Sequence, residues 1–267
     1  MEEREKEISF CAVPRHYKVR GCAVVLSVTG LVGAMWREVS VPRLIGDMRR
    51  RGTLEARYPN MTARDIARQW DRVASEACRL GTLMHEAIHG MLSGQPLDRD
   101  TSEIAVELEM ARQFVAEQIE AKGRRVFRTE MPIFYDDPAS GVVIPGSVDL
   151  LVSDPDGSII LFDWKRSRKL DASYDVSDVL PWLEDSKLNR FSLQLSLYAV
   201  ILRKCYRLNV KAMYLVALHP ENPDYRMIPA ADLTDVAERE LIGRYDFYRA
   251  RAEENNRVKE QNRRVLR

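Results

Sequence analysis

The sequence predicts a mixed α/β fold, in which a mixed central β-sheet is flanked by helices and preceded by a mostly helical N-terminal part. Three observations lead to this prediction. Strand-like apolar runs cluster in the middle of the chain, and a strong turn signal separates two of them. Apolar residues recur at helical spacing on both sides of this cluster. A further strand-like run then follows the later helical segment.

Composition limits the class of protein. The chain has 267 residues, of which 45% are hydrophobic and 30% are charged, enough for a sizeable core and a soluble surface. No apolar run approaches the ~18–20 residues that a membrane span needs. The acidic start, Met1–Glu7, lacks the features of a signal or transit peptide. We therefore expect an intracellular protein of the cytoplasm, a nucleoid or an organelle, with no membrane partner.

Charge and cysteine usage narrow the class further. The net charge of +1 neither requires nor excludes nucleic acid as a partner. Cys11, Cys22, Cys78 and Cys205 are far apart and form no C-x-x-C pair, so a structural zinc or iron–sulfur site is not expected. We expect reduced, mostly buried thiols.

The first elements are short. Residues 8–30 carry two β-type runs, Tyr17–Val19 and Cys22–Val28, which predict a hairpin or an edge pair. Residues 42–51 predict a short helix that begins at Pro42, because proline is tolerated in the first helical turn.

Two longer helices should follow. Either Asn60 or Thr62 can cap a helix that continues to about Met91, because its apolar residues recur at helical spacing. Residues 102–121 predict a second helix, which ends near Gly123. Together these two helices form most of the helical N-terminal part.

The pattern then changes to strands. Residues 126–134, 142–153 and 158–166 carry strand-like runs. The turn sequence Asp-Pro-Asp-Gly at 154–157 predicts that the last two form a hairpin.

The C-terminal third mixes both patterns. Residues 171–187 predict a loop, and residues 188–205 a helix. A strand is expected over 211–218 and a charged helix from about Leu233. The last dozen residues are polar and predict a frayed end.

The most informative residues are Asp163, Trp164 and Lys165, which end a strand-like run. Side chains alternate along a strand, so Asp163 and Lys165 should share one face while Trp164 takes the other. Asp149 ends the preceding strand, so two carboxylates and an ammonium should meet at neighbouring strand ends. Carboxylate oxygens bind hard divalent ions, and a nearby ammonium suits phosphodiester cleavage. Alone, each of these acids would be read as an ordinary turn or ion-pair residue.

Other polar residues can complete such a site. His85 lies on the long helix, where a lone histidine is more often a partly buried core residue. Gln194 and Tyr198 are one helical turn apart and present one face, as residues at a core boundary also do. Three basic residues follow the acid–lysine motif and are predicted to contact nucleic acid: Arg166, Arg168 and Lys169.

These motifs, in this order, resemble the RecB-like branch of the PD-(D/E)XK nucleases. That branch includes lambda-type exonucleases, helicase-associated nuclease domains, CRISPR-adaptation nucleases and mitochondrial genome maintenance exonucleases. The similarity covers roughly residues 81–218 and consists of four short motifs: Gly81-x-x-x-His85, Gly146-x-x-Asp149, Asp163-x-Lys165 and Gln194-x-x-x-Tyr198.

The resemblance implies roles for these residues. Ligands for Mg²⁺ or Mn²⁺ would be His85, Asp149, Asp163 and the backbone carbonyl of Trp164. Glu130 would be a further, outer acid. Lys165 would position or help to activate the attacking water, while Gln194 and Tyr198 would organise the site and the DNA.

The resemblance also implies an organisation: a single nuclease domain over residues 1–267 with a restriction-endonuclease-like core. The expected parts are an N-terminal hairpin and helix (1–60), a helical part carrying His85 (61–122), the nuclease core (123–218) and a C-terminal helix and tail (219–267). Two features depart from some relatives. Val148 replaces the proline before Asp149, and the cysteine spacing cannot hold the iron–sulfur cluster of several members, so no cluster is expected.

The expected function is a metal-dependent DNA nuclease, most simply an exonuclease of replication, recombination or repair, because small members of the branch are often exonucleases. Its partner would be DNA that is single-stranded or has free ends. Some relatives form rings around DNA, so an oligomer is compatible with the resemblance.

Two other classes remain open from the residues. His85-Glu86-x-x-His89 is formally the H-E-x-x-H pattern of zinc metallopeptidases, in which two histidines bind zinc and the glutamate acts as base. That reading leaves Asp149, Asp163 and Lys165 unexplained. A nuclease fold that only binds nucleic acid, without catalysis, is the third class.

Overall fold

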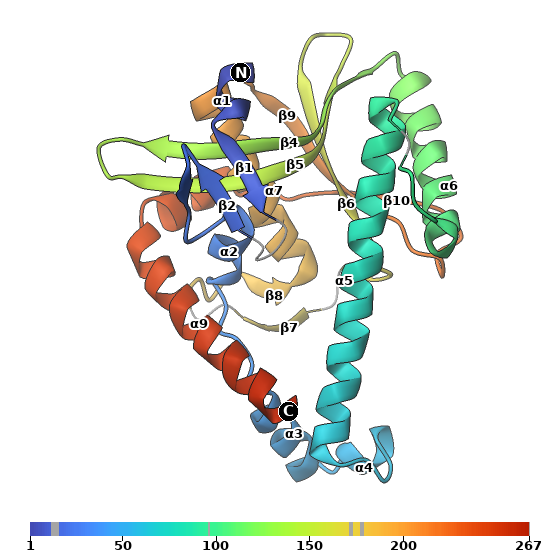
Figure 1. Cartoon of the computed structure of the whole chain (residues 1–267), viewed down its shortest axis with the longest axis vertical. Helices are drawn as coiled ribbons and strands as arrows, with labels where there is room; N and C mark the ends of the chain where they lie inside the picture. Colours follow the sequence, from blue (N-terminus) through green and yellow to red (C-terminus); the bar gives the residue numbers. More distant parts are fainter. Residues whose placement is uncertain (12–15, 96, 171–172, 177–178, 267) are drawn as a thin grey trace.

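A five-stranded mixed sheet forms the centre of the computed structural model, which describes residues 1–11, 16–95, 97–170, 173–176 and 179–266 (Figure 1). This arrangement confirms the predicted fold class. The strand order is β10-β9-β6-β5-β4. The strands are β4 (Arg125–Asp137), β5 (Val142–Ser153), β6 (Ile159–Lys165), β9 (Val210–Ala217) and β10 (Arg226–Pro229).

Strand direction follows from the connections. Short turns join β4 to β5 and β5 to β6, and both pairs are antiparallel. Strand β6 pairs in parallel with β9, since the chain returns through helix α7 (Lys187–Tyr206) between them. The edge strand β10, which pairs with β9, was not predicted; it is short and ends in Pro229.

Different helices pack against the two faces of the sheet. Along β6, Ile159 and Leu161 belong to the core that contains α7, whereas Ile160, Phe162 and Trp164 belong to the core of the opposite face. Helices α5 (Ala63–Ser93) and α6 (Ala105–Phe114) cover this second face. The alternation confirms that Trp164 points away from Asp163 and Lys165.

The long helix α5 was correctly predicted. Its N-cap is Thr62, whose hydroxyl accepts a hydrogen bond from the Asp65 N–H, and it ends at Gly94 in the left-handed region (φ 69°). The predicted helix over 102–121 is divided into a 3₁₀ turn (Ser102–Ile104), α6 and a π-helical turn (Val115–Glu120).

The N-terminal region forms a three-stranded antiparallel sheet after the short helix α1 (Glu2–Lys6). Its strands are β1 (Ile8–Cys11), β2 (His16–Val19) and β3 (Cys22–Ala23). The strand predicted over Cys22–Val28 is wrong beyond Ala23. Ser27 instead caps helix α2 (Val28–Gly33), because its hydroxyl accepts the Gly30 N–H and Leu31 and Val32 become buried.

A helical extension lies away from the sheet, where α3 contacts both α5 and α9 (Figure 1). Helices α3 (Val41–Arg50) and α4 (Leu54–Arg57) share a small core with α5, formed by Ile45, Leu54, Ile66 and Ala67. The α3 prediction is confirmed, whereas α4 was not predicted.

The C-terminal helix is interrupted rather than continuous. A short helix α8 (Thr234–Val236) and a π-helical turn (Ala237–Ile242) precede α9 (Tyr245–Leu266). The predicted frayed end is wrong, since α9 continues to Leu266. Asn255 and Asn262 hold α9 against the extended segment 36–41: each accepts one backbone N–H and donates to one backbone carbonyl.

Other expectations need correction. Within the predicted loop 171–187, β7 (Ser173–Val176) pairs with β8 (Glu184–Ser186), while 171–172 and 177–178 lie outside the described residues. Among the described residues no disulfide joins the cysteines, and the expectation that they are mostly buried is wrong, because Cys22 and Cys78 are exposed and Cys11 and Cys205 are half-buried. Among the described helices, none has the length and apolar character that crossing a membrane requires.

Candidate active site

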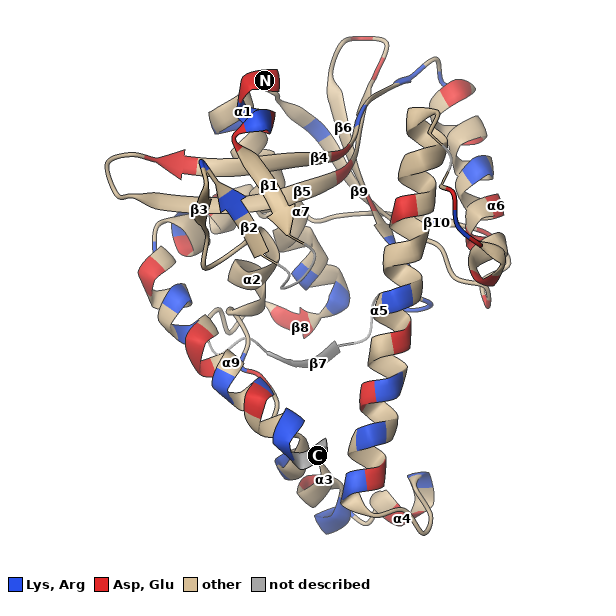
Figure 2. Cartoon of the chain, viewed as in Figure 1, with Lys and Arg blue, Asp and Glu red and all other residues tan. Residues whose placement is uncertain are grey.

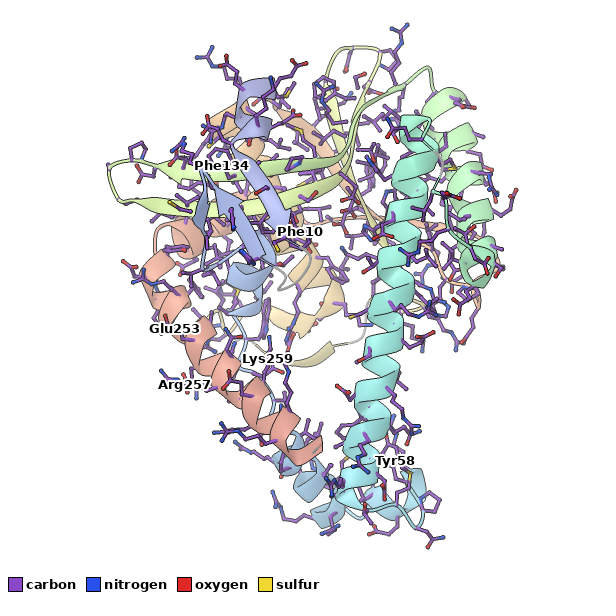
Figure 3. The ribbon with its side chains drawn as sticks, in the orientation of Figure 1. Phe10, Tyr58, Phe134, Glu253, Arg257 and Lys259 are labelled. Atoms are coloured by element: carbon purple, nitrogen blue, oxygen red, sulfur yellow. The ribbon has the colours of Figure 1, made fainter. Side chains whose placement is uncertain are left out.

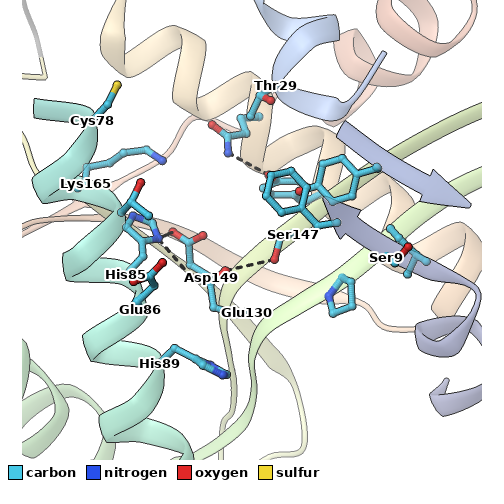
Figure 4. A pocket seen from close by; sticks show the side chains of 18 residues that line it. Ser9, Thr29, Cys78, His85, Glu86, His89, Glu130, Ser147, Asp149 and Lys165 are labelled. Atoms are coloured by element: carbon cyan, nitrogen blue, oxygen red, sulfur yellow. Dashed lines mark hydrogen bonds and ion pairs between the residues drawn. The ribbon is translucent and has the colours of Figure 1, made fainter. Parts of the chain in front are cut away.

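A cavity of about 660 Å³ opens where α5 and α7 approach strands β4 and β5 (Figure 4). Residues from distant parts of the sequence line it, including six of the predicted site residues: His85, Glu130, Asp149, Lys165, Gln194 and Tyr198. Asp163 and Trp164 lie directly behind this lining, on the same strand end as Lys165.

Asp149 occupies the point where β5 and β6 separate. Their pairing runs from Ser153–Ile159 to Leu150–Phe162, while β6 keeps its other partner, β9, as far as Lys165. The Trp164 N–H therefore has no β5 carbonyl opposite it. It donates instead to the Asp149 carboxylate (Oδ2, 2.8 Å). Strand separation thus places one carboxylate oxygen against β6, with only 7% of the residue exposed.

His85 joins this carboxylate from α5. Its Nδ1 lies 3.3 Å from Glu130 Oε1 and 3.6 Å from Asp149 Oδ2, and its Nε2 lies 3.1 Å from the Trp164 carbonyl oxygen. Both ring nitrogens face acceptors, so the arrangement holds an imidazolium with a proton on each nitrogen. His85, Glu130 and Asp149 offer donor atoms within 4.8 Å of one another, which suits a single cation.

Glu130 is closer to this group than the outer position expected from the sequence. Its backbone is in the left-handed region (φ 46°), which is unusual for a non-glycine residue in a strand. The Ser147 hydroxyl donates to its other oxygen (3.3 Å). Strained backbone of this kind persists where the surrounding structure demands it, and here it accompanies a carboxylate turned toward His85.

Asp163 and Lys165 form an ion pair on the same strand face, as alternation predicted. Asp163 is 1% exposed, and beyond this ion pair neither carboxylate oxygen has a hydrogen-bond partner among the described residues. The Lys165 ammonium also lies 4.4 Å from the centroid of the Phe191 ring, a contact that the sequence did not predict. Phe191 lies one helical turn before Gln194 on α7, and this spacing could have indicated that Phe191 faces the same site.

The pKa values of the two buried aspartates are displaced in a direction that suits a bound cation. Burial raises the pKa of Asp163 to about 6, although Lys165 partly opposes the shift. Burial also raises the pKa of Asp149, against the opposing charge of His85. For His85, burial disfavours the imidazolium, but Asp149 and Glu130 outweigh it and raise the pKa to about 9. Buried acids with unsatisfied oxygens beside an imidazole fit a divalent metal ion.

Gln194 and Tyr198 form the roof of the cavity. Gln194 Nε2 donates to the Tyr198 hydroxyl (3.0 Å), as their one-turn spacing allows. Burial raises the pKa of Tyr198 well above its usual value, so the phenol stays neutral. Gly146 permits this position, because a Cβ there would lie 2.7 Å from the Tyr198 ring and 3.1 Å from Val28.

The peptidase motif does not converge in the same way. His89 Nδ1 lies 3.3 Å from the Thr129 hydroxyl, and Glu86 forms an ion pair with Arg99 (2.8 Å). Among the described residues, the group that can hold a metal includes His85 but not His89. This geometry favours the nuclease interpretation of His85.

Two of the three predicted DNA-binding residues are engaged within the protein. Arg166 pairs with Glu107 (2.7 Å), an acid that is only 1% exposed, and Arg168 pairs with Glu221 (2.6 Å). Lys169 forms no ion pair with a described residue. The charges of Arg166 and Arg168 are therefore compensated, whereas no acid among the described residues compensates the charge of Lys169.

A comparison with family models identifies the family of this chain. A family model described as the PD-(D/E)XK nuclease superfamily matches residues 57–264, well over half of the chain. No curated protein matches. Among solved structures, one described as "Crystal structure of SSO0001" has 16% sequence identity and a TM-score of 0.36, over 87% of this chain and 75% of that chain. The chain belongs to the PD-(D/E)XK nuclease superfamily.

Proposed function

We propose that this protein is a Mg²⁺- or Mn²⁺-dependent deoxyribonuclease of the RecB-like branch that acts as an exonuclease in DNA replication, recombination or repair. One observation carries the proposal. His85, Glu130 and Asp149 offer donor atoms within 4.8 Å of one another, the Trp164 carbonyl oxygen lies 3.1 Å from Nε2 of His85, and Lys165 lines the same cavity.

The cation would be held by His85, Glu130, Asp149 and the Trp164 carbonyl, with Asp163 adjacent. When bound, a divalent ion lowers the pKa of a coordinated water and neutralises charge on the scissile phosphate. The mostly oxygen donor set favours Mg²⁺ or Mn²⁺ over zinc, and the single imidazole is well tolerated by Mn²⁺.

The chain's own residues would supply the rest. Lys165, positioned by Asp163 and the Phe191 ring, would place a positive charge where the phosphate gains negative charge in the transition state. Gln194 and the neutral Tyr198 would orient the phosphate from the other side of the cavity. The RecB-like order of the motifs supports the exonuclease assignment and DNA as substrate.

A digestion assay tests this proposal. End-labelled linear DNA and closed circular DNA are incubated with Mg²⁺, with Mn²⁺ and with EDTA. We expect cleavage of the linear DNA only, and only with metal. Cleavage of the closed circle would indicate an endonuclease, and no cleavage of any nucleic acid would indicate a binding module.

A matched pair of lysine variants sharpens the assay. Lys165→Ala should lose at least about 100-fold in rate, as the loss of one stabilising charge typically does. Lys211→Ala removes a surface lysine that pairs with Asp154 and Asp156, and it should cleave normally. If Glu86→Ala abolishes activity while Asp163→Ala does not, the peptidase interpretation replaces this one.

A further inference from the structure

Two aromatic side chains of the N-terminal sheet extend the wall of the cavity. Phe10 on β1 and Tyr17 on β2 are cross-strand partners, with ring centroids 4.8 Å apart. Both line the cavity that holds His85, Asp149 and Lys165. Phe10 remains 50% exposed although it is a large apolar residue (Figure 3).

Phe10 is exposed although the residue before it on the same face of β1, Ile8, is buried. Ile8 and Phe10 share one face of β1, because side chains alternate. On that face Ile8 is buried against Val19 and Phe134, and the strand covers the main sheet there. One step further along the same face, Phe10 extends past this small core, so its ring borders the cavity instead of packing beneath it.

We propose that Phe10 and Tyr17 form a stacking platform for an unpaired base of the strand whose phosphate reaches the His85–Glu130–Asp149 group. The proposal rests on the nuclease function proposed above. Aromatic side chains bind single-stranded nucleic acid by stacking on successive bases, and every base offers a suitable face. In a duplex, neighbouring pairs cover those faces except the outer face of each terminal pair, where the base is still held by its partner strand. The platform therefore selects single-stranded ends, without preference for sequence.

The dimensions of the site agree with such a ligand. Cavities of ~300–1,000 Å³ are usual for small ligands, and the cavity here, about 660 Å³, is continuous from the aromatic pair to Asp149. Polar groups that could contact the sugar and phosphate, Ser9, Thr29 and Gln194, line the same space.

The test compares kcat and KM on a single-stranded oligonucleotide and on a blunt duplex of the same sequence. For Phe10→Ala we expect KM on the single strand to rise roughly 5- to 140-fold, the loss of one stacked base, with kcat nearly unchanged. Values for the blunt duplex should not change. Phe10→Trp should restore the low KM, whereas Phe10→Leu, which keeps bulk without an aromatic face, should not.

Phe247→Ala is the matched control, because Phe247 is also a partly exposed phenylalanine (42%) but lies on α9 outside this cavity. It should leave both substrates unaffected. An unchanged KM for Phe10→Ala, an equal rise on both substrates, or full rescue by Phe10→Leu would each overturn the platform.

A binding measurement separates this inference from the proposed function. In EDTA, a single-stranded oligonucleotide carrying 2-aminopurine near its end should lose fluorescence when the base stacks on the wild-type protein. Phe10→Ala should bind without this quenching. If the protein cleaves no nucleic acid but quenches in this Phe10-dependent way, the nuclease proposal fails and the platform stands. Equal quenching by both proteins would overturn the platform even if cleavage is seen.

Discussion

Asp163 carries a charge that the metal-free protein stabilises poorly. Its folded-state pKa is about 6, compared with an ordinary value of 3.8, so the folded protein prefers the protonated acid. A raised carboxyl pKa lowers stability as pH rises from about 4 through 6, and the penalty is complete above that range. A bound cation would remove this penalty, so the free energy that the ionised carboxylate costs the metal-free protein would contribute to metal affinity.

Asp163→Asn should therefore stabilise the metal-free protein at pH 8, by up to about 3 kcal/mol, and should change little at pH 4. Urea unfolding in EDTA at both pH values measures this difference. Asp156→Asn is the control, because the pKa of this exposed acid is lowered by hydrogen bonds from Lys211 and Ser158; it should not stabilise. A less stable Asp163→Asn at pH 8 would contradict the prediction.

His85 should couple metal binding to pH. With a pKa of about 9, it is protonated in the metal-free protein at neutral pH, and the proton must leave before the imidazole can bind an ion. Affinity for Mn²⁺ should rise about tenfold per pH unit between pH 7 and 8.5, above the range in which Asp163 titrates. Calorimetry at several pH values measures this slope, and His85→Asn should flatten it. An unchanged slope in that variant would show that the proton released on Mn²⁺ binding comes from a group other than His85.

Single residues were predictable to the extent that short motifs define them. The proximity of Asp149, Asp163 and Lys165 could be predicted because strand alternation and strand order constrain where they lie, whereas His85 was suggested by the order of the motifs. The close approach of Glu130 could not, since it depends on a left-handed backbone that nothing in the local sequence specifies. The contact of Phe191 with Lys165 depends on how α7 is placed against β6, which is a tertiary property.

At the scale of elements, two asparagines of α9 bond to the backbone of segment 36–41. Their side-chain amides make the kind of hydrogen bonds that a neighbouring strand would make. Asn255 accepts the Glu38 N–H (2.8 Å) and donates to the Trp36 carbonyl (2.9 Å). Asn262, two turns later, makes the same pair of bonds to Val41 and Val39. Segment 36–41, which ends at the first residue of α3, thus satisfies four of its backbone groups without belonging to a sheet.

The two asparagines differ in burial, and this difference gives a prediction. Asn255 is 8% exposed, so Asn255→Ala leaves the buried Trp36 carbonyl and the half-buried Glu38 N–H without their partner and should cost about 1–3 kcal/mol of unfolding free energy. In Asn262→Ala water can replace the lost partner, and the cost should stay below about 1 kcal/mol. Chemical denaturation of both variants measures the difference. Equal costs would show that burial is not the controlling factor.

Elements with a strong internal pattern were predicted well. Helix α5 has a capping threonine and a regular apolar stripe, and β5 and β6 are joined by an Asp-Pro-Asp-Gly turn. The segment Cys22–Val28 was misassigned because β-branched residues favour strands, whereas the Ser27 cap and the burial of α2 decide the structure. Strand β10 was missed because its four residues are too few to show a strand pattern. Its structure depends on pairing with β9.

For the whole molecule, the net charge of +1 conceals an uneven distribution (Figure 2). Residues 41–72, which include α3, α4 and the start of α5, contain eight arginines and four acids, a net charge of +4 by subtraction (8 − 4). Since the whole chain carries +1, the remainder carries −3 (1 − 4). The helical extension is therefore basic, and a basic surface suits a nucleic-acid backbone.

Arg64 and Arg72 are exposed residues of this extension on α5. The double variant Arg64→Ala/Arg72→Ala should bind DNA more weakly, and the slope of log affinity against log salt should fall by up to about 2. Fluorescence anisotropy over a salt series measures both quantities. Arg226→Ala, on the edge strand β10, should change neither. Retention of the full salt slope would place the phosphate contacts elsewhere.

The length of α5 sets the shortest oligonucleotide that could reach both the basic extension and the cavity. A helix rises about 1.5 Å per residue, so the thirteen steps from Arg72 to His85 (85 − 72) separate the basic extension from the His85–Glu130–Asp149 group by about 20 Å. Because the helix is continuous over this interval, the separation acts as a fixed ruler. Oligonucleotides that span less than about 20 Å can occupy only one of the two places, whereas longer ones can occupy both. Affinity should therefore rise in a step, rather than gradually, as the strand is lengthened past that distance.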